Sequence, residues 1–421
     1  MTGPLRSSRR LSPRDPSALD ALRDVPLRWA VLVVLAGYVP LTFLGYGTDI
    51  DVANVLRAGR SWLDDGHYQL SRGPGAAIQE LATAVLDRIG GSVLINLVGV
   101  GFALLALWSL RQLLLVDRSR WPTLATLVLA ASPWFWLAST SLGDFTWALA
   151  LGLAGAVAAR RDRRILAGVL FALGIGCRAS TLLLVAAWLL AERTGVPSER
   201  VPWRATARTA AVTVVLGAAC FVPPWIDAGR SFAFLHNQLV FAGWGVQLGR
   251  WAVKNAAAAT VPAGLVLLVG LPHLRAALGR WRLSVVVRFA AVALVTEEVL
   301  FFRLPFKPVH LLPVIAAVAL LAGAAPLRNR RWLVALVVAQ LVAGAVGVTL
   351  AAPDHPDGAE SGRIDLRITS GVLWNDIQCR EDDRELGPWP TGKDALSQAE
   401  AMVRAEQNFS CQRDSWRATN P

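Results

Sequence analysis

Residues 92–116 read SVLINLVGVGFALLALWSLRQLLLV, an apolar run with few polar positions, among them Asn96 and Arg111. A helix rises about 1.5 Å per residue, so roughly 20 apolar residues cross the hydrocarbon core of a bilayer. The run is long enough for that crossing. It therefore predicts a helix that spans a membrane.

Similar apolar runs recur along most of the chain, and the composition agrees with them. Of the 421 residues, 54% are hydrophobic and only 17% are charged. Soluble globular proteins have roughly a quarter of their residues charged. The sequence thus predicts an all-α, multi-pass membrane protein.

The net charge of +12 invites the hypothesis of a nucleic-acid partner. Against it, the basic residues form short clusters between the apolar runs and are not pooled in one patch. Such clusters are typical of loops on the cytoplasmic side of a membrane. We expect membrane lipids, and no nucleic acid, around this chain.

The pattern predicts about 11 membrane helices. Their expected ranges are 27–47, 92–116, 122–142, 145–159, two short helices within 165–191, 209–226, 256–272, 285–302, 309–325 and 332–351. One helix over 165–191 is the alternative. Two helices, with a turn near Gly176–Arg178, keep the arginine clusters on both sides of this segment at the same face of the membrane.

The orientation that follows is that of a plasma-membrane protein with three parts. Residues 1–26 are a cytoplasmic tail, and residues 27–352 are the transmembrane domain. Within it, residues 48–91 form a large first outer loop with an amphipathic stretch at 76–90. Residues 353–421 are a small soluble tail on the outer side, and a disulfide between its Cys379 and Cys411 would stabilise it in an oxidising compartment. The sequence leaves that pairing open.

Charges beside membrane helices are costly and are candidates for function. On the predicted outer side they include Asp49, Asp51, Arg72, Glu80, Asp144, Arg178, Arg303, Lys307 and His310. A face with both carboxylates and cations suits a substrate that carries a phosphate and a group that loses a proton. Plainer interpretations are helix caps for the aspartates and interfacial anchoring for Arg303 and Lys307.

Three segments of the first outer loop carry a resemblance: DVANVLRAGR (51–60), LDDGHY (63–68) and SRGPG (71–75). In this order they resemble the GT-C membrane glycosyltransferases, which include protein O-mannosyltransferases and the lipid A aminoarabinose transferase. The similarity extends through Asp144, the stretch from LAGVL (166–170) to Arg178, and the basic residues between the helices at 285–302 and 309–325. It covers about residues 1–330. The family's acidic pair is often adjacent, whereas Ile50 separates the two aspartates here, so either one can be the catalytic residue.

The resemblance implies a GT-C-like fold and a reaction in which a hexosyl or pentosyl group moves on the outer face. The donor would be a polyprenyl-phosphate-linked sugar, and the acceptor a glycan, lipid or protein of the cell envelope. Asp51 would be the general base, with Asp49 as its rival. The candidate phosphate-binding cations are Arg178, Arg303 and Lys307, and further substrate-binding candidates are Arg72, Glu80, Asp144 and His310.

No cofactor is implied, although the many outer carboxylates leave a divalent metal open. The alternative function is a transporter or flippase for a lipid-linked or small polar substrate. Against it, the sequence shows no convincing internal repeat, and its charges gather at one face.

Overall fold

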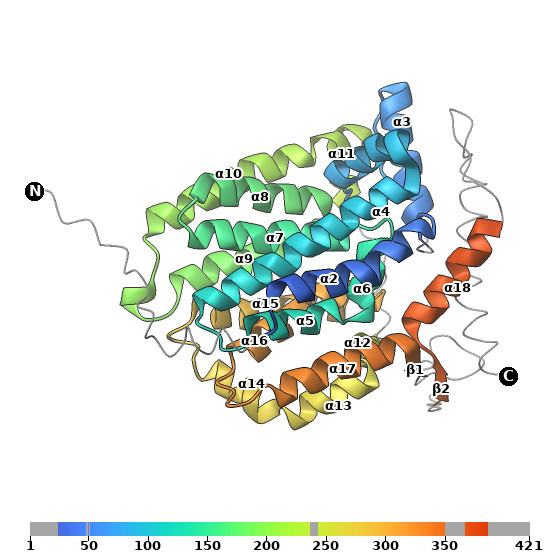
Figure 1. Cartoon of the computed structure of the whole chain (residues 1–421). Coiled ribbons are helices and arrows are strands. Elements are labelled where there is room, and N and C mark those ends of the chain that lie inside the picture. Colours follow the sequence, from blue (N-terminus) through green and yellow to red (C-terminus); the bar gives the residue numbers. More distant parts are fainter. Residues whose placement is uncertain (1–23, 48, 50, 236–242, 350–366, 386–421) are drawn as a thin grey trace, which may run out of the picture.

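The computed structural model of the protein describes residues 24–47, 49, 51–235, 243–349 and 367–385. These residues form a bundle whose longer helices run in roughly one direction (Figure 1). Apolar side chains from most of the helices meet in one large core. Most of the predicted cytoplasmic tail, and the parts of the C-terminal tail beyond residue 385, lie outside the described residues.

The helices of the N-terminal half are α2 (Leu27–Tyr38), η1 (Val39–Phe43), α3 (Asp51–Asp65), α4 (Ala77–Val116), α5 (Pro122–Ala130), α6 (Pro133–Thr140), α7 (Phe145–Arg160), α8 (Arg164–Cys177) and α9 (Thr181–Arg193). After the short η2 (Pro197–Glu199) come α10 (Trp203–Cys220), α11 (Val222–Asp227), η3 (Phe232–Leu235), α12 (Trp244–Ala259), α13 (Val261–Val269), α14 (Leu271–Leu278), α15 (Val285–Arg303), η4 (Pro308–Leu311), α16 (Leu312–Ala324) and α17 (Arg331–Ala345). The strands β1 (Val346–Thr349) and β2 (Arg367–Ser370) and the helix α18 (Val372–Glu385) complete the described chain.

Two predicted breaks are present. The 165–191 segment is indeed two helices, α8 and α9, because the backbone at Arg178 is extended (φ −157°, ψ 117°). The amphipathic stretch and the following apolar run are joined in α4, which is kinked at Gly90 and Gly91. Gly91 has φ 57°, a conformation that costs glycine little and other residues more.

Two predicted helices are wrong in detail. Residues 122–142 are not one helix, because α5 and α6 are bent by 70° at Pro133, whose ring cannot continue a helix. The preceding Ser132 is extended, as a residue before proline prefers to be. Similarly, the helix predicted at 256–272 begins earlier, as α12, and bends by 87° into α13 at Thr260.

The C-terminal part adds a short two-stranded sheet to a chain that is otherwise helical, as predicted. The predicted last helix, 332–351, ends at Ala345, and β1 then pairs antiparallel with β2. Helix α18 follows and packs on α17 and α6, at the same end of the bundle as α3 and α11 (Figure 1). Cys379 on α18 is disulfide-bonded, whereas its predicted partner Cys411 lies outside the described residues.

By length and apolar composition, one described helix, α4, is able to cross a membrane alone. The bent pairs α5–α6 and α12–α13 raise this to as many as three if each pair counts as one span. The other apolar helices in the described part are shorter. The predicted count of about 11 spans therefore stays a prediction.

Arg380 on α18 ties the tail to the bundle. Its guanidinium is buried, pairs with Asp376 at 2.7 Å and donates a hydrogen bond to the Thr140 carbonyl at the end of α6 (2.8 Å). We expect Arg380→Met to lower the free energy of unfolding in detergent by about 3–5 kcal/mol, because it removes one member of a buried ion pair. The exposed Arg163→Met is the matched control and should stay within about 0.5 kcal/mol of wild type. Equal losses in the two variants would contradict this role of Arg380.

Candidate active site

Several of the predicted site residues lie at the ends of helices or directly beside them. Asp51 begins α3, and Asp144 stands directly before α7. Arg178 occupies the break between α8 and α9, and Lys307 directly precedes η4. Segments far apart in the sequence thus deliver charged side chains to one place.

Asp49 shapes the start of α3. Its Oδ1 accepts a hydrogen bond from the backbone N–H of Asp51 (2.9 Å), as a capping carboxylate does. The same oxygen accepts from Lys307 Nζ at 2.5 Å. Lys307 Nζ also lies 3.5 Å from Asp51 Oδ2, so one ammonium group faces both aspartates.

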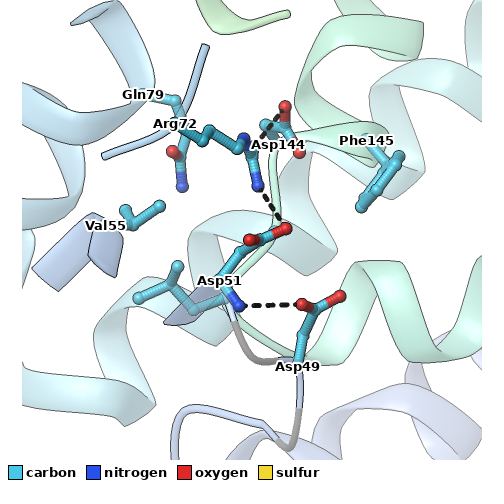
Figure 2. Close-up of a pocket in the computed structure, with 9 residues that line it drawn as sticks. Asp49, Asp51, Val55, Arg72, Gln79, Asp144 and Phe145 are labelled. Atoms are coloured by element: carbon cyan, nitrogen blue, oxygen red, sulfur yellow. Dashed lines mark hydrogen bonds and ion pairs between the residues drawn. The ribbon is translucent and has the colours of Figure 1, made fainter. Parts of the chain in front are cut away.

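Asp144 joins two arginines. Its Oδ2 lies 2.7 Å from Arg72 Nη2 and 3.0 Å from Arg178 Nη1, and its side chain is only 2% exposed. Arg72 also reaches the other aspartate, with Nη1 2.9 Å from Asp51 Oδ2 (Figure 2). Arg72 therefore bridges the base of α3 and the loop before α7.

Arg178 extends this cluster toward η4. Its Nη2 lies 3.2 Å from His310 Nδ1, and its guanidinium stacks 4.0 Å from the centre of the Phe145 ring. The Phe145 and His310 rings are themselves in contact, with centroids 5.2 Å apart. A guanidinium held by a carboxylate and an aromatic face has a fixed orientation.

Neighbouring charges keep Asp51, Asp144 and Arg72 in their charged forms. Burial raises the pKa of Asp51 and of Asp144, but the positive charge of Arg72, with Lys307 for Asp51 and Arg178 for Asp144, outweighs it and holds both pKa values below the ordinary range. Burial lowers the pKa of Arg72, but the charges of Asp144 and Asp51 outweigh that effect and raise it. Three cations and three carboxylates are thus nearly balanced: Arg72, Arg178 and Lys307 against Asp49, Asp51 and Asp144.

A small pocket lies beside these charges. Its walls include Asp49, Asp51, Val55, Arg72, Gln79 and Asp144 (Figure 2). Cations of this kind bind phosphate oxygens, and a carboxylate can accept a proton from a hydroxyl group. Among the described residues, no group of three or more His, Cys, Asp or Glu side chains is placed to hold a metal ion.

Two solved structures of one enzyme resemble this chain in fold. ArnT from Cupriavidus metallidurans in the apo state is 17% identical, with a TM-score of 0.53. The same enzyme bound to undecaprenyl phosphate is 18% identical, with a TM-score of 0.56, and both matches cover 92% of this chain and 76% of that one. ArnT is the lipid A aminoarabinose transferase, a GT-C enzyme. The chain has a GT-C fold.

An oligosaccharyltransferase from Archaeoglobus fulgidus is also similar, at 11% identity over 90% of this chain and 63% of that one. Its TM-score of 0.42 is too low to add to the fold assignment. No protein-family model matches the sequence, and no curated protein matches it either.

Two predicted site residues do not share the cluster in this GT-C fold. Glu80 is buried and accepts hydrogen bonds from Tyr68 Oη (2.6 Å) and Ser71 Oγ, so it holds the loop that carries Arg72. Arg303 has an exposed side chain at the end of α15, and its carbonyl accepts from Gln247 Nε2 (2.9 Å).

Phe145 and Gln79 are among the pocket residues that the sequence did not predict. The sequence pattern does not distinguish Phe145 from a residue of the hydrophobic core, because it is an aromatic residue at the start of an apolar helix. Gln79 was hidden because a glutamine at the start of an amphipathic stretch resembles a solvated position. The available signal for Gln79 was its place shortly after the SRGPG segment.

Asp144→Asn should lower the melting temperature by several degrees at neutral pH, because it leaves Arg72 and Arg178 without their shared carboxylate. The pKa of Asp144 is lowered, so its stabilising effect is complete above the ordinary aspartate pKa of about 4 and is lost as pH falls through the lower value. Melting of wild type and variant in detergent, from pH 7 downward, measures this. The difference should be constant at neutral pH and shrink only below about pH 4. A difference that grows on acidification would contradict the assignment.

Proposed function

We propose that this protein is a membrane glycosyltransferase that takes a sugar from a polyprenyl-phosphate donor and transfers it to a hydroxyl group of a cell-envelope acceptor. The observation that carries the proposal is the cluster of three cations and three carboxylates beside a pocket on a GT-C fold. ArnT, whose fold it shares, has been solved with undecaprenyl phosphate bound. We assign the site to the outer face of the plasma membrane, in line with the arginine clusters of the opposite loops.

In the proposed reaction, the acceptor oxygen bonds to the anomeric carbon of the sugar as its proton passes to Asp51. The bond between that carbon and the phosphate oxygen breaks, and its electron pair leaves with the polyprenyl phosphate. Arg72, Arg178 and Lys307 stabilise the negative charge that grows on the phosphate. The arginines offer paired donors and the lysine a point charge.

The ion pairs of the free protein explain how Asp51 becomes a base. Arg72 and Lys307 lower its pKa, which makes it a weak proton acceptor. A donor phosphate that binds these cations neutralises part of their positive charge. The pKa of Asp51 then rises toward the working pH, so the base is strengthened when the donor is present.

Asp51 is favoured over Asp49 by its contacts. The Oδ1 of Asp49 accepts hydrogen bonds from both the Asp51 N–H and Lys307 Nζ. Asp49 therefore holds the start of α3 and the lysine in place. Asp144 is less suited than either, because it is buried between two arginines. Asp49 and Asp144 thus position the helix start and the cations.

The test is transfer of radiolabelled sugar from polyprenyl-phosphate donors to an envelope extract by purified protein in lipid. Asp51→Asn should lower transfer at least about 100-fold, and Asp49→Asn less than about ten-fold, because only the former removes the proton acceptor. Asp64→Asn, which removes a carboxylate of the same loop that pairs with Arg88, is the matched control and should stay near wild type.

Activity that survives in both Asp51→Asn and Asp49→Asn would refute the assignment of the base. Label that crosses the bilayer of sealed vesicles, with no transfer from any donor, would favour the transporter.

A further inference from the structure

Gln79 lines the pocket, and one polar atom of its buried amide has no hydrogen-bond partner among the described residues. Its side chain is 1% exposed, and its Nε2 donates to Thr83 Oγ1, one helical turn along α4, at 3.1 Å. Its Oε1 has no hydrogen-bond partner among the described residues. Figure 2 shows the Gln79 side chain beside Val55 and Arg72, at the wall of the pocket.

An unpaired buried acceptor costs free energy that a hydrogen-bond donor would recover. That alone does not define a site, because Gln340 in α17 is also buried with an unpartnered Oε1. Gln340 does not line the pocket, whereas Gln79 does. The difference in location makes Gln79 a candidate for contact with substrate and Gln340 its natural control.

The neighbours of Gln79 indicate which part of a bound donor its side chain would contact. If Arg72 holds the phosphate, the sugar carbon attached to that phosphate lies at the same wall of the pocket. The hydroxyl group on the next ring carbon is the sugar hydroxyl nearest that phosphate, so it would be the first to come within reach of Gln79. A neutral amide accepts this hydrogen bond without repelling the phosphate, as another carboxylate would.

Resting on the proposed function, we propose that Gln79 Oε1 accepts a hydrogen bond from the sugar hydroxyl next to the anomeric carbon and thereby selects donors that carry it. This hydroxyl becomes a stronger donor as positive charge develops on the sugar ring in the transition state. Gln79 is thus a residue for specificity as well as binding. Thr83 orients the amide by occupying its Nε2 end.

The test compares undecaprenyl-phosphate hexose and pentose donors with analogues that lack only this hydroxyl. The quantity measured is the ratio of kcat/KM for the complete donor to that for its deoxy analogue. Because the missing hydroxyl also changes intrinsic reactivity, each variant's ratio is compared with that of wild type. Gln79→Leu should lower the ratio at least about ten-fold, while Gln340→Leu should leave it unchanged.

Gln79→Met serves as a second apolar variant of similar length should the leucine variant be unstable. A ratio that Gln79→Leu and Gln79→Met leave at the wild-type value overturns the proposal while the proposed function stands. A matching fall in Gln340→Leu also overturns it, since the effect would then be structural. No transfer of any donor by wild-type protein overturns the proposed function and this inference together.

Discussion

The site depends on one buried carboxylate. Asp144 binds Arg72 of the first loop and Arg178 of the break between α8 and α9, and through Arg178 it is connected to His310 in η4. A partly buried arginine is stabilised by a carboxylate partner, and Asp144 is the carboxylate that both guanidinium groups share. Three segments distant in the sequence are thereby fixed around one pocket.

The equal numbers of cations and carboxylates allow the free protein to hold a phosphate-binding site without leaving these cations unpaired. Its cations are already placed to bind a phosphate group. While no phosphate is present, they form ion pairs with the carboxylates. A bound phosphate would replace some of the carboxylate contacts. The repulsion among the three cations is therefore offset by negative charge both with and without the donor. The same exchange would leave Asp51 more basic when the donor is bound.

The charges of the site were accessible from the sequence because charged residues beside apolar helices are rare and costly. The break at Arg178 was likewise predicted, since the arginine clusters on either side demanded two short helices. The bends at Pro133 and Thr260 were missed because both lie inside long apolar runs, where hydropathy hides a local change of direction. Arg303 and Glu80 show the other limit: sequence places charges near a face, but only the fold decides that one is exposed and the other pairs with Tyr68 and Ser71.

The central claim is that Arg72, Arg178 and Lys307 are the phosphate site of a lipid-linked donor. A structure of the protein in lipid with undecaprenyl phosphate, solved by electron cryomicroscopy, tests it most directly. We expect phosphate oxygens within hydrogen-bond distance of Arg72 and Lys307, and we expect Asp51 to have lost its contact with at least one of these cations. Phosphate density away from all three cations, with the ion pairs of Asp51 and Asp144 intact, would contradict it.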